Sequence, residues 1–281
     1  MDYSEEKYKN ILLGLLDKFI LICKELNLSY TLLGGSVLGA IRHGGIIPWD
    51  DDIDIGMPRA DYEKFISIAN NFLEKDYKVA TIYNDNNYMY PFAKLYDNNT
   101  TIIESKDFFY IGGVYIDIFP LDGIPQQNGN TRFTIIRKLR YSITNPLFIK
   151  YSFSYEEKMS FYYFANKIIY KTSNLILKIC NKMASKYPCT KDYNIVNYFG
   201  AWREKEISDY SWFFPLKEYS FEGRKVWGPN NYDAYLKKMY GDYMTPPPIE
   251  KRKSHHLHYF IDLSYKYTME EIIKNEILKK M

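Results

Sequence analysis

The segment from Leu33 to Met57, LGGSVLGAIRHGGIIPWDDDIDIGM, constrains the fold of this chain more than any other. It holds six glycines, and four aspartates fall within five consecutive positions. Glycine costs backbone entropy and clustered carboxylates repel one another, so neither half favours stability by itself. The end of the segment alternates apolar and polar residues, which predicts a β-strand with one buried face. The alternating positions are Ile53, Ile55 and Met57 against Asp52, Asp54 and Gly56.

The composition is that of a globular protein with a substantial core. Of the 281 residues 46% are hydrophobic, which suits one large domain or two closely packed ones. Three cysteines at irregular spacings make a disulfide framework improbable and favour a reducing compartment. The N-terminus does not resemble a signal peptide, and no apolar run approaches the ~18 residues of a membrane span. We therefore expect a cytoplasmic protein, either soluble or peripheral at the inner face of the membrane.

Residues 1–125 read as a mixture of helices and strands. Ser4 is placed to cap a helix whose apolar positions recur at helical spacing as far as Leu26. A second helix is predicted at 59–73, and strands are predicted at 29–35, 53–57, 77–83, 92–96, 100–104 and 114–119, the last bounded by Pro120. This order predicts an α/β (α+β) fold, with a mixed β-sheet core and flanking helices.

The pattern changes after residue 125. Helices are predicted at 132–143, 156–173 and 174–187, with a capping box from Ser154 to Glu157, and later at 232–241 and 268–281. Residues 126–190 hold eleven Lys or Arg against two Glu, a net charge of +9, so the remainder carries −6. We predict a catalytic core at 1–125, a basic helical insertion at 126–191, and an aromatic-rich C-terminal segment at 192–281 that packs back on the core.

The aspartates are the first candidate site. Side chains two apart on a strand share a face, so Asp52 and Asp54 point the same way and Asp51 points away from them. Paired carboxylates on a rigid strand suit Mg²⁺, which is usually shared with substrate phosphates. A solvated acidic turn is the structural alternative. A calcium loop is excluded, because Ile55 stands where an EF-hand requires glycine.

The glycines are the second candidate site. Gly34 and Gly35 end a strand, and Ser36 begins a short helix whose free N–H groups suit an anion. The segment is neither a P-loop nor a dinucleotide-binding fingerprint. By itself the segment is weak evidence for an anion site, and a tight turn is the favoured interpretation. Together with two aspartates 17 residues further on, it supplies the parts that hold a metal-bound polyphosphate.

This combination resembles a known family. A Gly-Gly-Ser turn followed by two alternating carboxylates is similar to the signature of the nucleotidyltransferase superfamily. The fuller GGSVLGAIRHGGIIPWDDDIDIGMPRADYEKF resembles the LicD family of bacterial phosphocholine transferases, related to the fukutin-type enzymes. The later segments GGVYIDIFPLDGIP, with Asp117, and YLKKMYGDYMTPPP extend the similarity. The resemblance implies a nucleotidyltransferase-like core in which Asp52, Asp54 and Asp117 bind Mg²⁺ or Mn²⁺ and serve catalysis.

Further residues are candidates for substrate binding, each with a structural alternative. Lys94 lies on a predicted strand, where it could meet a phosphate or be solvated at a sheet edge. Arg42 and His43 follow the glycine turn and could contact phosphate or order the loop. Trp49 is expected to pack that loop. Three later histidines lack the spacing of a zinc site and are predicted to belong to a basic loop that reaches the substrate, namely His255, His256 and His258.

The resemblance implies a reaction and its partners. Phosphocholine would pass from CDP-choline to a sugar hydroxyl of a cell-surface glycan, such as teichoic acid or lipopolysaccharide, or of its lipid-linked precursor, and CMP would leave. The alternatives are another CDP-alcohol such as CDP-ribitol, transfer of a nucleotide, or a non-catalytic glycan- or membrane-binding protein. Residues 210–228 have enough aromatics to cage choline or simply to pack. The basic helices could contact anionic membrane or pack as solvated structure, and no nucleic acid is implied.

Overall fold

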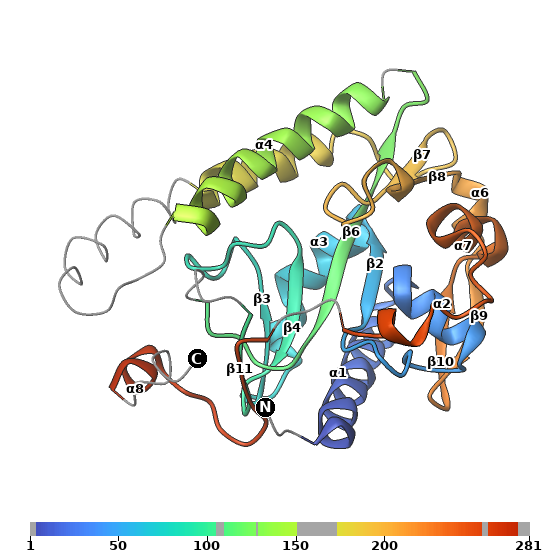
Figure 1. The fold of residues 1–281 in the computed structure, drawn as a ribbon. Coiled ribbons are helices and arrows are strands. Elements are labelled where there is room, and N and C mark those ends of the chain that lie inside the picture. The colour runs from blue at the N-terminus through green and yellow to red at the C-terminus, as the bar shows by residue number, and fades with distance from the viewer. Residues whose placement is uncertain (1–3, 105–109, 128, 151–172, 255–257, 275–281) are drawn as a thin grey trace.

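The computed structural model describes residues 4–104, 110–127, 129–150, 173–254 and 258–274 (Figure 1). Its centre is a mixed sheet in the order β1-β2-β6-β4-β3. Strand β7 also pairs with β6, and β8 pairs with β7. The strands are β1 (Thr31–Leu32), β2 (Asp54–Pro58), β3 (Tyr77–Ala80), β4 (Ala93–Asp97), β6 (Tyr115–Ile124), β7 (Asn194–Val196) and β8 (Ile207–Ser208). Strands β2 and β6 run parallel, and the other pairs are antiparallel. The predicted α+β class is confirmed.

Helices surround this sheet, and two further strand pairs form separate two-stranded sheets. The helices are α1 (Glu5–Leu26), α2 (Gly34–Arg42), α3 (Arg59–Ile68), α4 (Gly129–Lys150), α6 (Tyr210–Phe213), α7 (Tyr232–Tyr240), α8 (Met269–Lys274) and an unlabelled helix at residues 173–184. Short 3₁₀ turns are η1 (Ala69–Asn71), η2 (Arg203–Glu206) and η3 (Ile249–Lys251). A hairpin joins β9 (Lys217–Phe221) to β10 (Arg224–Gly228), and β11 (Phe260–Asp262) pairs with β5 (Thr101–Ile103).

The first helix forms as its sequence predicts. The Ser4 hydroxyl accepts a hydrogen bond from the backbone N–H of Lys7 at 3.2 Å, which caps the helix. Two glutamates in the first turn suit the positive end of the helix dipole. Asn27 ends the helix in the left-handed region, with φ of 50°. The apolar stripe, which includes Leu12, Leu15 and Phe19, is buried in the core.

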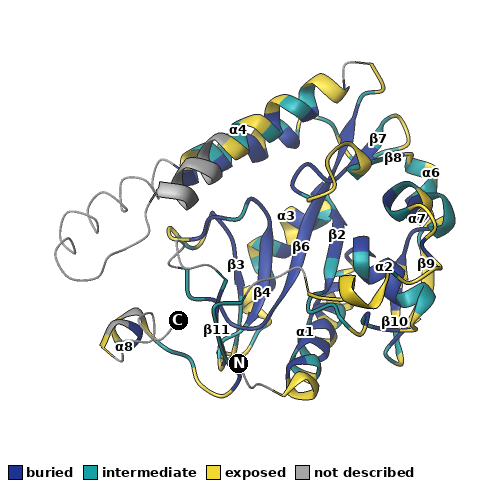
Figure 2. Ribbon diagram, in the orientation of Figure 1, coloured by how far each residue is buried: buried dark blue, intermediate teal, exposed yellow. Residues whose placement is uncertain are grey.

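Strand β6 is the spine of the molecule, and all ten of its residues are buried (Figure 2). The sequence predicted that Pro120 would end this strand, and that prediction is wrong. Pairing with β4 stops at Ile118 and pairing with β7 starts at Asp122, so Pro120 lies between the two ladders. On its other side Pro120 is the register partner of Met57 on β2. On the side of β4 and β7 a residue without an N–H is tolerated, because neither antiparallel ladder includes it.

The regions after residue 125 return to this core. Strand β7 pairs with the end of β6, and β11 pairs with β5. Helix α4 lies beside the helix at 173–184, where Arg132 donates to the Met183 carbonyl and the Cys180 thiol lies 4.0 Å from the Ile136 carbonyl. One side of α4 is buried and the other exposed (Figure 2). The capping box at 154–157 and most of the helix predicted at 156–173 fall outside the described residues.

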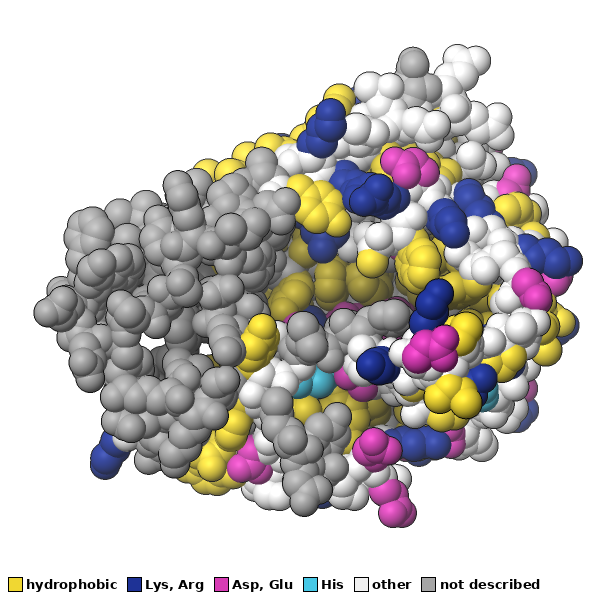
Figure 3. Space-filling model, viewed as in Figure 1, with side chains coloured by type: hydrophobic (Ala, Val, Ile, Leu, Met, Phe, Trp, Pro, Cys, Tyr) yellow, Lys and Arg dark blue, Asp and Glu magenta, His cyan; other side chains and the backbone are white. Residues whose placement is uncertain are grey.

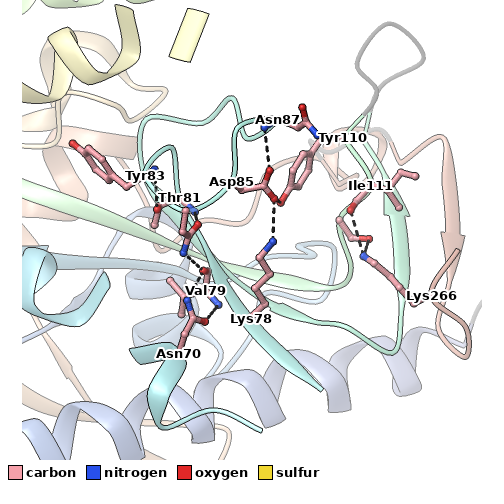
Figure 4. A network of polar contacts seen from close by, with 12 residues as sticks. Asn70, Lys78, Val79, Thr81, Tyr83, Asp85, Asn87, Tyr110, Ile111 and Lys266 are labelled. Atoms are coloured by element: carbon pink, nitrogen blue, oxygen red, sulfur yellow. Dashed lines mark hydrogen bonds and ion pairs between the residues drawn. The ribbon is translucent and has the colours of Figure 1, made fainter. Parts of the chain in front are cut away.

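Local polar contacts brace the edge of the sheet at β3 (Figure 4). The Asn70 side chain bonds both the N–H and the carbonyl of Val79, at 2.8 and 3.0 Å. Lys78 meets the Asp85 carboxylate at 3.0 Å, and Tyr110 donates to the same carboxylate. Each polar group here has a partner within the chain. This edge therefore serves the architecture of the sheet.

Candidate active site

Three charged residues lie side by side across the middle of the sheet. Asp54 of β2 is the register partner of Asp117 on β6, and Asp117 is in turn the partner of Lys94 on β4. Register partners on adjacent strands point to the same face of a sheet. The structure thus brings together three of the predicted site residues, although they come from three strands that are well separated in the chain.

Asp54 lies in an electrostatically unfavourable environment. Burial raises the pKa of its carboxyl well above the usual range, and the charges of Asp52, Asp117 and Asp50 raise it further. Asp52 lies just before β2, which begins at Asp54, and it remains close enough to act on this carboxyl. Repulsion of this kind is relieved when a cation lies between carboxylates.

The glycine turn is shaped around these carboxylates. Gly34 and Gly35 form the first turn of α2, and Gly34 has φ of +48°, in the left-handed region. A Cβ on Gly35 would lie 2.7 Å from an oxygen of Asp50, and one on Gly34 would lie 3.3 Å from an oxygen of Asp54. The glycines are therefore required for the close approach of acidic side chains to the start of this helix.

Ser36 connects the turn to the strand. Its hydroxyl oxygen accepts a hydrogen bond from the Asp54 N–H at 2.8 Å, and the side chain is buried. The Gly34 N–H donates to the Tyr235 hydroxyl at 2.8 Å. Ser36 and Tyr235 thus fix α2 against β2 and α7. A contact of Gly34, Gly35 or Ser36 with phosphate stays a prediction.

Lys94 was expected either to meet a phosphate or to be solvated at a sheet edge. The alternative of a solvated lysine at a sheet edge is wrong, because β4 lies between β6 and β3 and the Lys94 side chain is 2% exposed. Its ammonium lies 3.2 Å from an oxygen of Asp117 and 3.2 Å from an oxygen of Glu104. It also faces the Tyr115 ring at 3.2 Å from the ring centroid. Lys94 therefore acts on the site through Asp117, and a direct phosphate contact stays a prediction.

The aspartate run divides between two roles. A ring nitrogen (Nε2) of His258 lies 2.9 Å from the Asp51 carboxylate, and both side chains are largely buried. The Tyr8 hydroxyl donates to the Asp51 carbonyl. Asp51 thus anchors the segment that follows η3. His255 and His256 lie outside the described residues.

Arg42 and His43 lie at the opposite end of α2 from the glycines. The Arg42 Nε donates to the His43 Nε2 at 2.9 Å, and its Nη1 donates to the Tyr243 carbonyl at 2.7 Å. Both side chains contact Trp49, which is thereby packed as expected.

In the view of Figure 3, which is that of Figure 1, the molecule is hollowed near its middle. Hydrophobic side chains lie in the hollow, with Lys, Arg and acidic side chains around it.

The carboxylates of the site are of the chemical type that binds magnesium. Carboxylate oxygens are hard ligands, and Mg²⁺ takes one or two of them together with water and substrate phosphates. Within the described part of the chain, no group of three or more His, Cys, Asp or Glu side chains is placed to hold a metal ion. Asp54 and Asp117 are register partners, and Asp52 lies close to Asp54. Metal binding by these three residues stays a prediction.

Comparison with known proteins supports the resemblance seen in the sequence. The family model described as LicD/FKTN/FKRP, nucleotidyltransferase domain, matches residues 27–137. The lipopolysaccharide cholinephosphotransferase LicD of Haemophilus influenzae is 30% identical over 256 residues, which is 88% of this chain and 94% of that protein. The chain belongs to the LicD family. It is therefore a phosphotransferase, as the sequence predicted.

A shorter match involves a different member of the same broad group. Over 28 residues, this LicD-family chain is 68% identical to the ribitol 5-phosphate transferase FKRP of human and of mouse. That stretch is 10% of this chain and 6% of the mammalian protein. The family is thus shown by the long match, and the short one keeps open which group is transferred.

Sequence reasoning about this LicD-family chain missed residues that complete the site. Glu104 binds Lys94 and accepts a 2.5 Å hydrogen bond from Tyr90. These two partners lower its pKa below the ordinary value even though burial opposes ionisation. The Tyr240 hydroxyl lies 3.6 Å from the position of a Cβ on Gly34. The resemblance of the segment containing Tyr235 and Tyr240 was the one available signal, and it did not reveal their contacts.

The aromatic segment at 210–228 is used for packing. Tyr210 stacks on Phe214 with ring centroids 4.8 Å apart, and Phe213 meets Tyr235 edge-on at 5.2 Å. Phe213 is buried in the main core. Described contacts therefore account for several of these rings without a ligand.

Proposed function

We propose that this enzyme transfers phosphocholine from CDP-choline to a sugar hydroxyl of a cell-surface glycan or its lipid-linked precursor, and releases CMP. The observation that carries the proposal is the alignment of Asp54 with Asp117 on parallel strands, beside a glycine turn shaped to admit carboxylates. Family membership and the name of the Haemophilus relative support the transferred group.

Asp52, Asp54 and Asp117 would hold a Mg²⁺ ion, or Mn²⁺ in its place. When bound, the ion would neutralise charge on the donor diphosphate and orient it. The fit rests on the oxygen donors and on the raised pKa of Asp54, which burial and then repulsion from the neighbouring aspartates cause.

The other roles belong to side chains and backbone of the chain itself. The first turn of α2, with Ser36, would bind phosphate oxygens, and Arg42 and His43 would bind further along the donor or acceptor. Lys94 and Glu104 hold Asp117 in a fixed orientation. Asp117 would orient the attacking hydroxyl by accepting its hydrogen bond.

The atoms of the reaction balance without a further reactant. The sugar oxygen forms a bond to the phosphorus of phosphocholine, and the bond from that phosphorus to the CMP oxygen breaks. The hydroxyl proton passes to Asp117 or to solvent. The chain contributes positioning and charge rather than a covalent intermediate, as is general for phosphoryl transfer.

Two alternatives are separated by one experiment. The enzyme could use another CDP-alcohol, which the short match to a ribitol 5-phosphate transferase favours, or transfer a nucleotide. The test is a panel of CDP-choline, CDP-ribitol and CDP-glycerol with a glycan acceptor, read by CMP release and product mass. We expect CMP release with CDP-choline and a glycan heavier by phosphocholine. A product carrying CMP would overturn the proposal in favour of nucleotidyl transfer, and release only from CDP-ribitol would reassign the donor.

A non-catalytic glycan- or membrane-binding protein is the remaining alternative. A buried carboxyl whose pKa is raised by burial and by neighbouring carboxylates, as that of Asp54 is, favours a catalytic site over such a module. Absence of CMP release from every donor, with a folded protein and added Mg²⁺, would favour it.

We also propose that the enzyme works in the cytoplasm and meets its acceptor at the inner face of the membrane. No described helix is long and apolar enough to cross a membrane. Large apolar side chains are nevertheless exposed on the basic helices, with Ile135 at 50%, Leu175 at 59% and Ile179 at 44%. Exposed Lys138 and Lys182 lie among them. Apolar and cationic side chains together suit an anionic lipid surface.

A further inference from the structure

A cluster of basic side chains surrounds one tryptophan beside the aspartates. The guanidinium carbon of Arg42 lies 5.8 Å from the Trp49 ring centroid, and that of Arg252 lies 5.2 Å from it. The His43 ring meets the same indole edge-on at 5.7 Å. These residues come from the end of α2, the loop before β2 and the turn after η3, so the fold assembles the cluster from distant segments.

Both guanidinium groups lie against the same indole ring, and no carboxylate pairs with either among the described residues. Arg42 donates to His43 and to the Tyr243 carbonyl, and Arg252 donates to the Pro247 carbonyl. Among the described residues, neither forms an ion pair, and hydrogen-bond donors remain on both. Burial and the charge of Arg252 lower the pKa of Arg42. Like charges collected in this way are stabilised when an anion binds between them.

The histidine is arranged to respond to the same anion. Its Nε2 accepts the Arg42 hydrogen bond, so that nitrogen carries no proton. Burial, followed by the charges of Arg42 and Arg252, lowers the pKa of His43. The neutral ring leaves its Nδ1–H as a donor. A planar guanidinium fork and an imidazole N–H are both suited to phosphate oxygens.

The cluster is next to the aspartates but separate from them. Trp49 directly precedes Asp50, whose carboxylate lies over Gly35. On the side of the aspartates, the Tyr240 hydroxyl lies 3.6 Å from the position of a Cβ on Gly34. The two ends of α2 are roughly 12 Å apart at 1.5 Å per residue, and helix side chains lean towards the N-terminus.

We propose that Arg42, Arg252 and His43, ordered around Trp49, form a second phosphate-binding subsite that does not depend on a metal. It takes a phosphate group of a substrate, carried either by the nucleotide of the donor or by the acceptor glycan. The inference rests on the proposed function only for the carrier of that phosphate. The subsite itself is open to a binding measurement without turnover.

The test is calorimetric titration of the full-length chain with CMP and with a sugar 1-phosphate, in excess chelator. Arg252→Gln is the main variant, because the side chain is exposed and its loss carries little risk to folding. Lys253→Gln is the matched control, since it removes the same charge one residue away from an exposed position. We expect at least one compound to bind, with affinity at least tenfold weaker in Arg252→Gln and within twofold of the parent in Lys253→Gln.

The compound that binds more tightly identifies the carrier of the phosphate. A preference for CMP assigns the subsite to the donor, and a preference for the sugar phosphate assigns it to the acceptor. Equal weakening by Arg252→Gln and Lys253→Gln would show only diffuse attraction and would overturn the proposal. So would the failure of both compounds to bind without metal. Neither result would affect the aspartate site, whose test is CMP release with Mg²⁺.

Discussion

The parallel ladder between β2 and β6 carries acidic residues at both ends, and the two ends are treated in opposite ways. At one end Asp122 is fully buried and receives a bidentate bond from Arg59, at 2.8 and 2.6 Å. The third Arg59 nitrogen donates to Asn181 at 3.2 Å. At the other end Asp54 faces Asp117, and the strongest charges on it are those of other aspartates.

The difference separates an acid that stabilises the fold from one for which we propose a catalytic role. The carboxylate of Asp122 is neutralised within the chain, so its partner is permanent. Asp117 forms an ion pair with Lys94, whose ammonium also pairs with Glu104. Repulsion among the carboxylates near Asp54 lowers the stability of the folded state, and a cation bound between them would relieve it.

Asp54→Asn should produce the largest loss of activity. It removes a charged oxygen from the metal-facing pair, so we expect CMP release to fall at least 1000-fold, equivalent to about 4 kcal/mol. Stability should be unchanged or slightly higher, because repulsion falls. Asp52→Asn should lose activity in the same way. Asp76→Asn, at an exposed position, is the control. Near-parental activity of Asp54→Asn would contradict the metal assignment.

Removal of divalent metal should reduce activity to a comparable extent, through the end of the ladder that carries Asp54 and Asp117 (the open end). It should have no effect on the end where Arg59 neutralises Asp122 (the closed end). We expect excess chelator to abolish CMP release, and Mg²⁺ or Mn²⁺ to restore it. Calcium should not, because its looser and larger coordination misplaces the phosphates. Thermal unfolding should show stabilisation by Mg²⁺ in the parent and none in Asp54→Asn. Full activity in chelator would rule out the mechanism.

Substitutions at the closed end, where Arg59 pairs with Asp122, should change the stability of the fold and not the chemistry. Asp122→Asn or Arg59→Met leaves a buried partner uncompensated, so we expect the free energy of unfolding to fall by about 3–5 kcal/mol. The double variant Arg59→Met/Asp122→Leu should recover much of that loss, since no charge is left buried. Denaturant titration measures each value. If the single and double variants were equally unstable, the pair would not be the source of the effect.

The sequence predicts features that depend on neighbouring residues in the chain better than features that depend on contacts between distant segments. Helix α1, strand β2 and helix α7 follow local patterns of caps and periodicity. Strand β2 begins at Asp54, so Asp52, which spacing on one strand paired with Asp54, lies just outside the strand. The burial of Lys94 could not be predicted, because it depends on β4 being internal to the sheet. The prediction that Pro120 ends strand β6 was wrong for the same reason, because its environment depends on where the pairing with β4 stops and the pairing with β7 starts.

The pairs that distinguish the two ends of the ladder have no sequence signal. Arg59 and Asp122 are 63 residues apart, and neither lies in a pattern that singles it out. The Trp49 cluster likewise requires Arg252, which is distant in the chain from Arg42. Family resemblance found the segments that carry the aspartates, but only the fold shows which acids are neutralised.

Glu206 gives a smaller test, near the open end. Burial raises the pKa of this carboxyl from 4.5 to about 7, although the Trp202 N–H bond opposes the shift. The folded state thus binds the proton more tightly than the unfolded one. Stability should be greatest below pH 4.5 and should decline as pH rises to about 7. Glu206→Gln keeps the acceptor for Trp202, so it should remove this decline.

The expected gain for Glu206→Gln at pH 8 is about 2 kcal/mol, reduced from the full shift because the side chain is partly solvated. Unfolding titrations at pH 5 and pH 8 measure it. Glu204→Gln, at an exposed position in the same turn, is the control. An equal effect of Glu206→Gln at both pH values would show that its charge does not matter. Asp54, the other carboxyl whose pKa burial raises near this end, is distinguished by its loss of activity.

The smallest expected effect concerns the basic helices, which neither end of the ladder requires. If they meet an anionic membrane, each Lys or Arg near the surface contributes on the order of 1 kcal/mol. Arg140 is unsuitable for the test, because its guanidinium donates to the Phe199 carbonyl at 2.6 Å and its loss would disturb packing. Arg137→Glu/Lys138→Glu changes the same helix without touching that bond.

Vesicle co-sedimentation provides the measurement for this surface. We expect binding to anionic vesicles at low salt that weakens with added salt, because surface charges are screened. Arg137→Glu/Lys138→Glu should reduce binding by more than tenfold, whereas Lys24→Glu/Lys75→Glu, with two exposed lysines elsewhere, should reduce it much less. Leu175→Ala should weaken binding in a salt-independent way, because its side chain is apolar and exposed. If the parent ignores anionic vesicles at low salt, these helices are structural, and the acceptor must reach the aspartates from solution.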